Sequence, residues 1–284
     1  MEINKYASIE VKKKLIGVVG GVGPEASNKF CEFLISKKKG TCDQDKIPFV
    51  HLCNPQIPDR TDYILGLGKD PTPELIKTSK ILENLGVDLI IVPCNTAHVF
   101  LPKVQEEIKV PIVDMEKILV KKILLDKNHL KKIGLLTTDG ALKSKIFQSY
   151  FNEVGIETIL PDKYEQENLV MKSIYGKEGI KSGKKLIPKR LLTQAIKSLI
   201  ERGAEAIVLG CTELPLVIKQ KDFSIKVFDP MELTAREIVN YVESSENEVI
   251  VTMKYEIREF AEKMFTEIDT EKMFTKVDLE AELK

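Results

Sequence analysis

Two cysteines stand at matching points of two similar stretches, residues 88–98 (DLIIVPCNTAH) and residues 205–215 (EAIVLGCTELP). In each stretch an apolar run typical of a buried strand ends near one cysteine, and polar residues follow it. Cysteine can act as a base in its thiolate form and as an acid in its thiol form. Cys94 and Cys211 are therefore candidates for shared acid–base chemistry.

The spacing of these cysteines indicates an internal repeat. Cys94 and Cys211 lie 117 positions apart, and the same offset joins two pairs of glycines, Gly17 with Gly134 and Gly86 with Gly203. In α/β sheets, ligands bind beyond the carboxyl ends of the strands. Two similar halves that face each other would therefore place both thiols on one cleft.

The apolar runs are short and show no alternation, which favours parallel strands covered on both faces. We expect strands within residues 14–21, 47–53, 88–93, 111–114, 132–138, 155–161, 205–210 and 225–229. The predicted fold is α/β with two pseudosymmetric domains, each a four-stranded parallel sheet flanked by helices, and the active site in the cleft between them. The first domain would comprise residues 14–115 plus about 226–245, and the second residues 116–225.

The two ends of the chain are less informative. Residues 1–13 are polar and would form an N-terminal extension, either an extra strand or a frayed end. Residues 246–284 would form a C-terminal extension of unassigned role. Within it, residues 248–260 indicate a strand followed by a helix, and the tail repeats KMFT. A docking or dimerisation helix and a partner-binding tail both remain open.

Composition narrows the class of protein. The chain has 43 Lys and Arg residues against 43 Asp and Glu residues, so nothing points to a nucleic-acid partner. No apolar run approaches the roughly 20 residues of a membrane span, and the N-terminus has no apolar core typical of a secretory signal. Five cysteines without a disulfide-like spacing favour free thiols and a cytoplasmic location.

Several chemistries can use two opposed thiols. A disulfide is disfavoured in a reducing compartment. A metal site would need further ligands, but only His98 lies near Cys94 and none follows Cys211, so no metal is expected. Racemisation fits best: one thiolate removes the α-proton of a carbon acid, and the opposite thiol delivers a proton to the other face. A following helix N-terminus or a nearby cation could lower the thiol pKa from about 8.5.

The motifs around these cysteines resemble those of a known family. PCNTAH (93–98) and GCTELP (210–215) resemble the paired signatures of the cofactor-independent aspartate/glutamate racemases. GGVGPEAS (20–27), IPDRT (57–61) and IYGKEGIKSGK (174–184) resemble further family motifs, and the resemblance covers roughly residues 14–242. Glu213 stands where glutamate racemases usually carry His, which favours the aspartate branch. Val22 replaces the usual Met of the N-terminal loop.

The resemblance implies a cofactor-independent enzyme, with neither pyridoxal phosphate nor metal, that acts on a small amino acid and is commonly a homodimer. It implies that Arg60 and Lys181 bind substrate carboxylates, although each also reads as an ordinary surface cation. Arginine offers a bidentate fork for a carboxylate.

The remaining candidates follow from their places beside these motifs. Asn95, Thr96 and Thr212 could bind a carboxylate or cap helices, and Thr138 could line the cleft. Glu213 and His98 could tune the thiols, and a close Glu213 carboxylate would raise the pKa of Cys211. The backbone of the loop Gly21, Val22 and Gly23 is expected to hold a substrate carboxylate. The same loop fits a dinucleotide fingerprint, but the next strand ends without the acidic residue that this fingerprint requires.

The sequence therefore predicts a pyridoxal-phosphate-independent amino-acid racemase that interconverts L- and D-aspartate through Cys94 and Cys211. One alternative is a glutamate or broad-specificity racemase, or a maleate-isomerase-like thiol enzyme, on the same scaffold. Another, of a different class, is a non-catalytic amino-acid-binding module.

Overall fold

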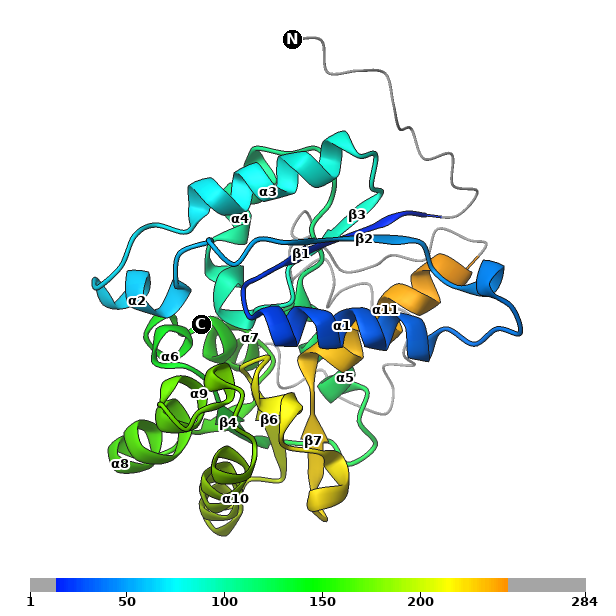
Figure 1. Ribbon diagram of the computed structural model, residues 1–284. Helices are drawn as coiled ribbons and strands as arrows, with labels where there is room; N and C mark the ends of the chain where they lie inside the picture. Colours follow the sequence, from blue (N-terminus) through cyan, green and yellow to red (C-terminus); the bar gives the residue numbers. More distant parts are fainter. Residues whose placement is uncertain (1–13, 245–284) are drawn as a thin grey trace, which may run out of the picture.

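The apolar runs become the strands of two parallel sheets in the computed structural model, which describes residues 14–244 (Figure 1). The first sheet has the order β2-β1-β3 and the second the order β5-β4-β6-β7. The strands of the first sheet are β1 (Ile16–Gly20), β2 (Phe49–Cys53) and β3 (Leu89–Ile91). Those of the second are β4 (Lys132–Leu136), β5 (Glu157–Ile159), β6 (Ala206–Leu209) and β7 (Lys226–Phe228).

Helices cover both faces of the first sheet because successive strand residues point to opposite sides. Ile16 and Val18 of β1 belong to an apolar cluster with α1, α5 and α11, whereas Val19 packs with α3 and α4. Figure 1 shows α3 and α4 on one side of this sheet and α1 and α11 on the other. The helices of this part are α1 (Pro24–Lys37), α2 (Arg60–Leu65), α3 (Thr72–Asn84), α4 (Leu101–Glu106), α5 (Met115–Leu124) and α11 (Pro230–Glu243).

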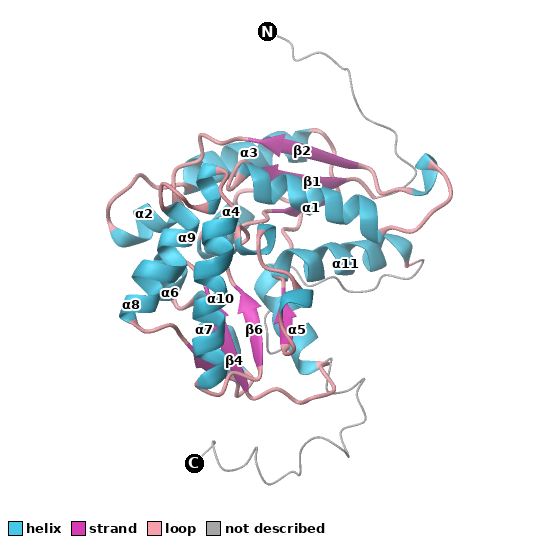
Figure 2. Ribbon diagram, turned by 60° about the horizontal axis from the view of Figure 1, so that its bottom comes forward, coloured by secondary structure: helices cyan, strands magenta, loops and turns pink. Residues whose placement is uncertain are grey.

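The second sheet is covered in the same way. Leu136 and Ile207 pack against α9 and α10, whereas Ile133 and Val208 pack against α5 and α7. The helices are α6 (Asp139–Ser144), α7 (Ile146–Glu153), α8 (Lys163–Glu165), a π-helix (Gln166–Met171), α9 (Lys172–Tyr175) and α10 (Leu186–Glu201). In Figure 2 the strands of the two sheets lie in separate layers, with α5 reaching from one toward the other.

The structure confirms the α/β fold with parallel sheets and changes one detail of the first sheet. Residues 111–114 were expected to form its fourth strand, but they contribute only an isolated bridge between Ile90 and Ile112. The segment is too short for a ladder because Asp114 already caps the N-terminus of α5. The first sheet therefore has three strands.

The division into two domains stays a prediction. Residues 226–245 were expected to return to the first domain, but residues 226–228 form β7, which pairs with β6 in the second sheet. α11 follows β7 and packs against α1 in the first half. The expected elements in residues 1–13 and 246–284 lie outside the described residues.

The two halves touch through short helices next to the strand ends. α2 lies against α6, and a Cβ at Gly140 would stand 2.7 Å from the Cα of Thr61. Glycine thus allows close approach of these helices. Among residues 14–244, none of the helices combines the length and the apolar character that crossing a membrane requires.

Candidate active site

Cys94 lies just beyond β3, at the N-cap of a short 3-10 helix (Asn95–Val99). Its side chain is free and only 7% exposed, and it packs in one apolar cluster with Val22 and Ala97. The helix that follows is therefore one 3-10 segment and not the α-helix whose dipole was expected to favour a thiolate. Any stabilisation of a negative sulfur must come from nearby side chains.

Cys211 lies in the equivalent place beyond β6, and a turn leads from it into a 3-10 helix (Leu214–Leu216). It is free and 8% exposed, and it packs with Leu209 and Leu214. Burial and then the Glu213 carboxylate raise the pKa of this thiol to about 12, although Lys181 offsets part of the effect. Cys94 also contributes to the shift, so the two thiols lie near enough to influence each other's charge.

Arg60 is the first residue of α2 and turns inward rather than into solvent, with 6% of its surface exposed. Its Nη1 donates to the carbonyl oxygens of Pro58 at 2.9 Å and Ile57 at 3.3 Å. The guanidinium also lies close enough to Cys94 for the sulfur to raise its pKa. Burial alone would lower the pKa of Arg60, but Cys94 and Asp59 outweigh it, and the pKa is raised. A fully charged arginine thus sits beside the first thiol.

A carboxylate, and not a guanidinium, has the largest effect of any charged side chain on the pKa of the second thiol. Glu213 is buried, and its Oε1 lies 3.5 Å from Nζ of the partly exposed Lys181. Burial raises the pKa of Glu213, while Lys181 lowers it in part. Lys181 also stands 5.2 Å from the ring centre of Tyr175. The predicted rise in the pKa of Cys211 from a close Glu213 is therefore present in the structure.

The N-terminal loop approaches this carboxylate. Gly21 and Gly23 have φ values of +87° and +95°, and a Cβ at Gly23 would collide with Oε1 of Glu213. Only glycine adopts this backbone without strain. The N–H of Gly21 already donates to the hydroxyl of Ser27 at 3.3 Å. If the Gly21 N–H holds a substrate carboxylate, as expected, it must first give up its bond to Ser27.

The polar residues after the cysteines are buried and partly unpaired. The side-chain oxygen and nitrogen of Asn95 have no hydrogen-bond partner among the described residues. Thr96 pairs with Thr138 of the other half through hydroxyls 3.0 Å apart. Thr212 is buried beside Cys211. A ligand that brings its own donors and acceptors would satisfy Asn95, because unpaired buried polar groups are unfavourable.

Two residues of the site were not expected. The Tyr175 hydroxyl donates to Oδ2 of Asp59 at 3.1 Å, and Asp59 in turn caps the helix that carries Arg60. This contact joins α9 in the second half to α2 in the first. Both residues stand within the motifs quoted above, but no spacing along the chain shows that they meet.

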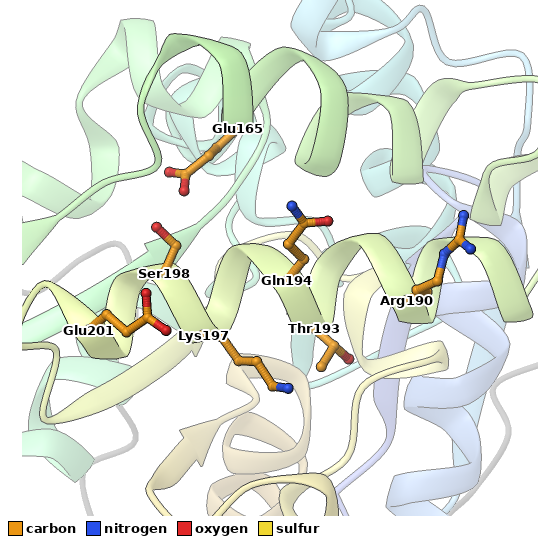
Figure 3. Close-up of a pocket in the computed structure, with 7 residues that line it drawn as sticks. All are labelled: Glu165, Arg190, Thr193, Gln194, Lys197, Ser198 and Glu201. Atoms are coloured by element: carbon orange, nitrogen blue, oxygen red, sulfur yellow. The ribbon is translucent and has the colours of Figure 1, made fainter.

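A separate hollow of about 630 Å³ runs along α10, away from both cysteines (Figure 3). Its lining is polar and of mixed charge, formed by Glu165, Arg190, Thr193, Gln194, Lys197, Ser198 and Glu201. It contains no thiol and none of the expected site residues. None of the expected chemistry therefore falls in this hollow.

Comparison with known proteins places the chain in a family. The profile of the Asp/Glu/hydantoin racemase family matches residues 19–238.

The chain belongs to the Asp/Glu/hydantoin racemase family.

The relatives of this racemase differ in the substrate that their names give. The chain is 26% identical over 230 residues to the broad specificity amino-acid racemase RacX of Bacillus subtilis, covering 80% of this chain and 97% of RacX. It is 27% identical over 170 residues to the glutamate racemase of Aquifex aeolicus, covering 58% of this chain and 63% of that protein. The aspartate racemase of Picrophilus torridus superposes with a TM-score of 0.67 at 30% identity, covering 80% and 92% of the two chains.

These findings confirm the family resemblance that the cysteine motifs carried, and with it an isomerase. They leave the preferred amino acid and the role of each site residue as proposals.

Proposed function

We propose that this racemase interconverts the L and D forms of an acidic amino acid, with aspartate preferred, by proton transfer between Cys94 and Cys211. The observation that carries the proposal is the pair of free, buried thiols at equivalent strand ends, one beside a guanidinium and the other beside a carboxylate. A two-base racemisation needs one thiolate and one thiol at the start of each turnover.

The proposed reaction balances without any group beyond the side chains. The thiolate takes the α-proton and becomes a thiol, and the electron pair of the broken C–H bond moves into the adjoining carboxylate. The opposite thiol then gives its proton to the other face of Cα and becomes a thiolate. One turnover therefore exchanges the protonation states of the two cysteines, and the reverse turnover or solvent restores them.

The charged residues suit a substrate with two carboxylates. Arg60 carries an Nε without an acceptor among the described residues, so it has a donor left for a ligand. Lys181 is partly exposed and held by Glu213, so a second carboxylate could take its place as partner. The aspartate racemase of Picrophilus torridus supports aspartate, whereas RacX supports a wider range.

A chiral chromatography assay of a panel of amino acids tests the substrate. We expect aspartate to be racemised with the highest kcat/KM and alanine to be a poor substrate, because alanine brings one carboxylate. Activity should survive chelators and hydroxylamine and be lost on thiol alkylation. Equal rates for alanine and aspartate would contradict the preference, and tight binding of aspartate without Cα exchange would favour a binding module instead.

A further inference from the structure

Three buried polar side chains lie beneath Cys94 and take no part in the proton transfer described above. His98 belongs to the 3-10 helix that begins after Cys94, and Asp114 and Glu116 stand at the start of α5. All three are essentially inaccessible to solvent, and their ligating atoms lie within 4.8 Å of one another. Buried polar clusters of this kind are unfavourable unless each group is paired, so their hydrogen bonds are informative.

The hydrogen bonds of His98 identify its tautomer. Nδ1 lies 2.9 Å from the carbonyl oxygen of Cys94, which can only accept, so Nδ1 carries a hydrogen. The backbone N–H of Met115 donates to Nε2 at 3.2 Å, so Nε2 presents its lone pair. His98 is therefore neutral, in agreement with its pKa, which burial lowers.

Glu116 completes this arrangement as a neutral acid. Its Oε2 lies 3.3 Å from Nε2 of His98, which has no hydrogen to give. No group in residues 14–244 donates a hydrogen bond of ordinary geometry to either carboxyl oxygen. An ionised Glu116 would leave a buried charge facing a lone pair. Burial followed by Asp114 raises the pKa of Glu116 well above its ordinary value, which favours the neutral acid at this position.

Asp114 has the opposite surroundings, and this argues against a metal ion in the cluster. Its Oδ1 accepts from the N–H of Lys117 at 3.0 Å and its Oδ2 from the Tyr150 hydroxyl at 2.9 Å. The ammonium of Lys117 lies 3.6 Å away. Both carboxyl oxygens of Asp114 thus accept from protein donors, and both ring nitrogens of His98 are already engaged. A cation would have to displace these bonds.

We propose that His98, held in its neutral Nδ1–H form by the carbonyl oxygen of Cys94 and the backbone N–H of Met115, is a positioning residue that fixes the Cys94 loop to the start of α5. The inference rests on the two-thiol racemisation proposed above and extends it to one half of the reaction. The position that matches His98 at the offset of 117 is Pro215, which has no side-chain donor. His98 therefore supports the first thiol only.

The decisive experiment separates the two thiols. In the Cys211→Ser background, Cys94 is the working base, and His98→Asn should slow exchange of Cα–H with D2O on the order of 10- to 100-fold, because catalysis falls steeply with misplacement of a reacting group. In the Cys94→Ser background, the same change should leave exchange of the other enantiomer within about twofold. His129→Asn, at an exposed histidine with φ of 49°, is the control. Equal losses in both backgrounds would mean a general structural role and overturn the proposal.

Glu116 provides a second variant, which tests whether this buried acid is neutral. Glu116→Gln has nearly the same shape and no charge, so this variant should retain most of the Cys94-dependent exchange. If Glu116→Gln is as damaging as His98→Asn, Glu116 must act as a carboxylate, and the neutral cluster around His98 is wrong.

A measurement that does not depend on activity keeps this proposal apart from the racemisation itself. Alkylation of each cysteine by iodoacetamide, followed by peptide mass spectrometry, should show a changed rate at Cys94 in His98→Asn and an unchanged rate at Cys211. If no single-thiol variant exchanges either enantiomer while this selective change is seen, the two-thiol mechanism fails and the positioning role stands. Unchanged alkylation of Cys94 would overturn the positioning role.

Discussion

Cys94 and Cys211 occupy equivalent strand ends, but the charges around them differ. The guanidinium of Arg60 lies near Cys94, whereas the carboxylate of Glu213 raises the pKa of Cys211 and the ammonium of Lys181 is paired with that carboxylate. Both thiols are buried to nearly the same degree. Burial therefore does not distinguish them, and the side chains contributed by loops do.

This difference suggests a division of labour in the resting enzyme. A thiol with a pKa of about 12 holds its proton at neutral pH, so in the proposed mechanism we expect Cys211 to start a turnover as the acid. We expect Cys94, beside Arg60, to start it as the base. The two halves share a backbone plan, and the residues after each cysteine have diverged: Glu213 matches Thr96 at the offset of 117, and Pro215 matches His98.

Replacement of either thiol should have the largest effect. Cys94→Ser and Cys211→Ser should each reduce racemisation on the order of 10³-fold or more, because turnover needs both an acid and a base and a serine hydroxyl is too weak to serve. Each variant should retain slow exchange of Cα–H with D2O, for opposite enantiomers, measured by NMR. The exposed Cys42→Ser is the matched control.

This experiment can also contradict the division of labour. If either single variant racemises at close to the wild-type rate, the two-base mechanism is wrong. If both variants exchange the same enantiomer, the thiols do not face opposite sides of Cα.

Arg60 tests the charge next to the first thiol. Arg60→Ala should lower kcat/KM for acidic amino acids on the order of 10²-fold, because a buried hydrogen-bonded charge contact is lost. Arg60→Lys should recover only part, since lysine cannot replace the planar fork whose Nη1 bonds two carbonyls while its Nε is left for a substrate carboxylate. Arg190→Ala, an exposed arginine on α10, is the control. Unchanged kinetics with a folded Arg60→Ala would remove Arg60 from the site.

Glu213 tests the charge next to the second thiol, with a smaller effect that depends on pH. Activity falls at alkaline pH when the acid thiol loses its proton. A raised pKa of Cys211 therefore moves the alkaline limb of the pH–activity profile to higher pH. After burial, the Glu213 carboxylate is the largest cause of the raised pKa of Cys211. Glu213→Gln removes this charge, so the pKa of Cys211 should fall and the loss of activity at alkaline pH should begin at a lower pH. The rate at neutral pH should change by less than about tenfold, because burial still keeps Cys211 protonated there.

The matched control for this profile is Glu201→Gln, an exposed carboxylate on α10. A limb that stays in place in Glu213→Gln, or moves upward, would show that the carboxylate does not act on Cys211.

The strands could be predicted from the sequence more completely than the contacts of the candidate site. Short apolar runs located the seven strands of residues 14–244, because burial on both faces leaves a plain signal along the chain. The predicted fourth strand of the first sheet was wrong because Asp114 caps the next helix instead of extending a ladder. The motifs singled out both cysteines and Arg60, and the roles of these residues stay predictions.

The contacts between distant segments could not be predicted. Arg60 bends back to bond carbonyl oxygens of its own loop, and His98 lies against Glu116. Both contacts depend on how segments pack where the two halves meet. Periodicity along the chain carries no information on such packing, and buried carboxyls such as Glu116 look like ordinary helix residues in sequence.

The hydrogen bond between Thr96 and Thr138 gives the smallest expected effect. It joins the loop after Cys94 to the N-cap of α6 in the other half, with both hydroxyls buried and 3.0 Å apart. Thr96→Val should destabilise the protein by about 1 kcal/mol, the usual net value of such a bond. Thr138→Val should cost more, because the same hydroxyl also accepts from the N–H of Ala141 as a helix cap.

A double-mutant cycle in urea measures the bond itself. If the two hydroxyls interact, the double variant should lose less stability than the sum of the single variants, with a coupling of about 0.5–1.5 kcal/mol. Thr138→Ser, which keeps the hydroxyl, should restore most of the loss. Because Thr96 follows Cys94 directly, Thr96→Val should also slow Cys94-dependent exchange more than Cys211-dependent exchange. Additivity within about 0.3 kcal/mol, with both exchange reactions slowed equally, would show that this bond does not distinguish the two thiols.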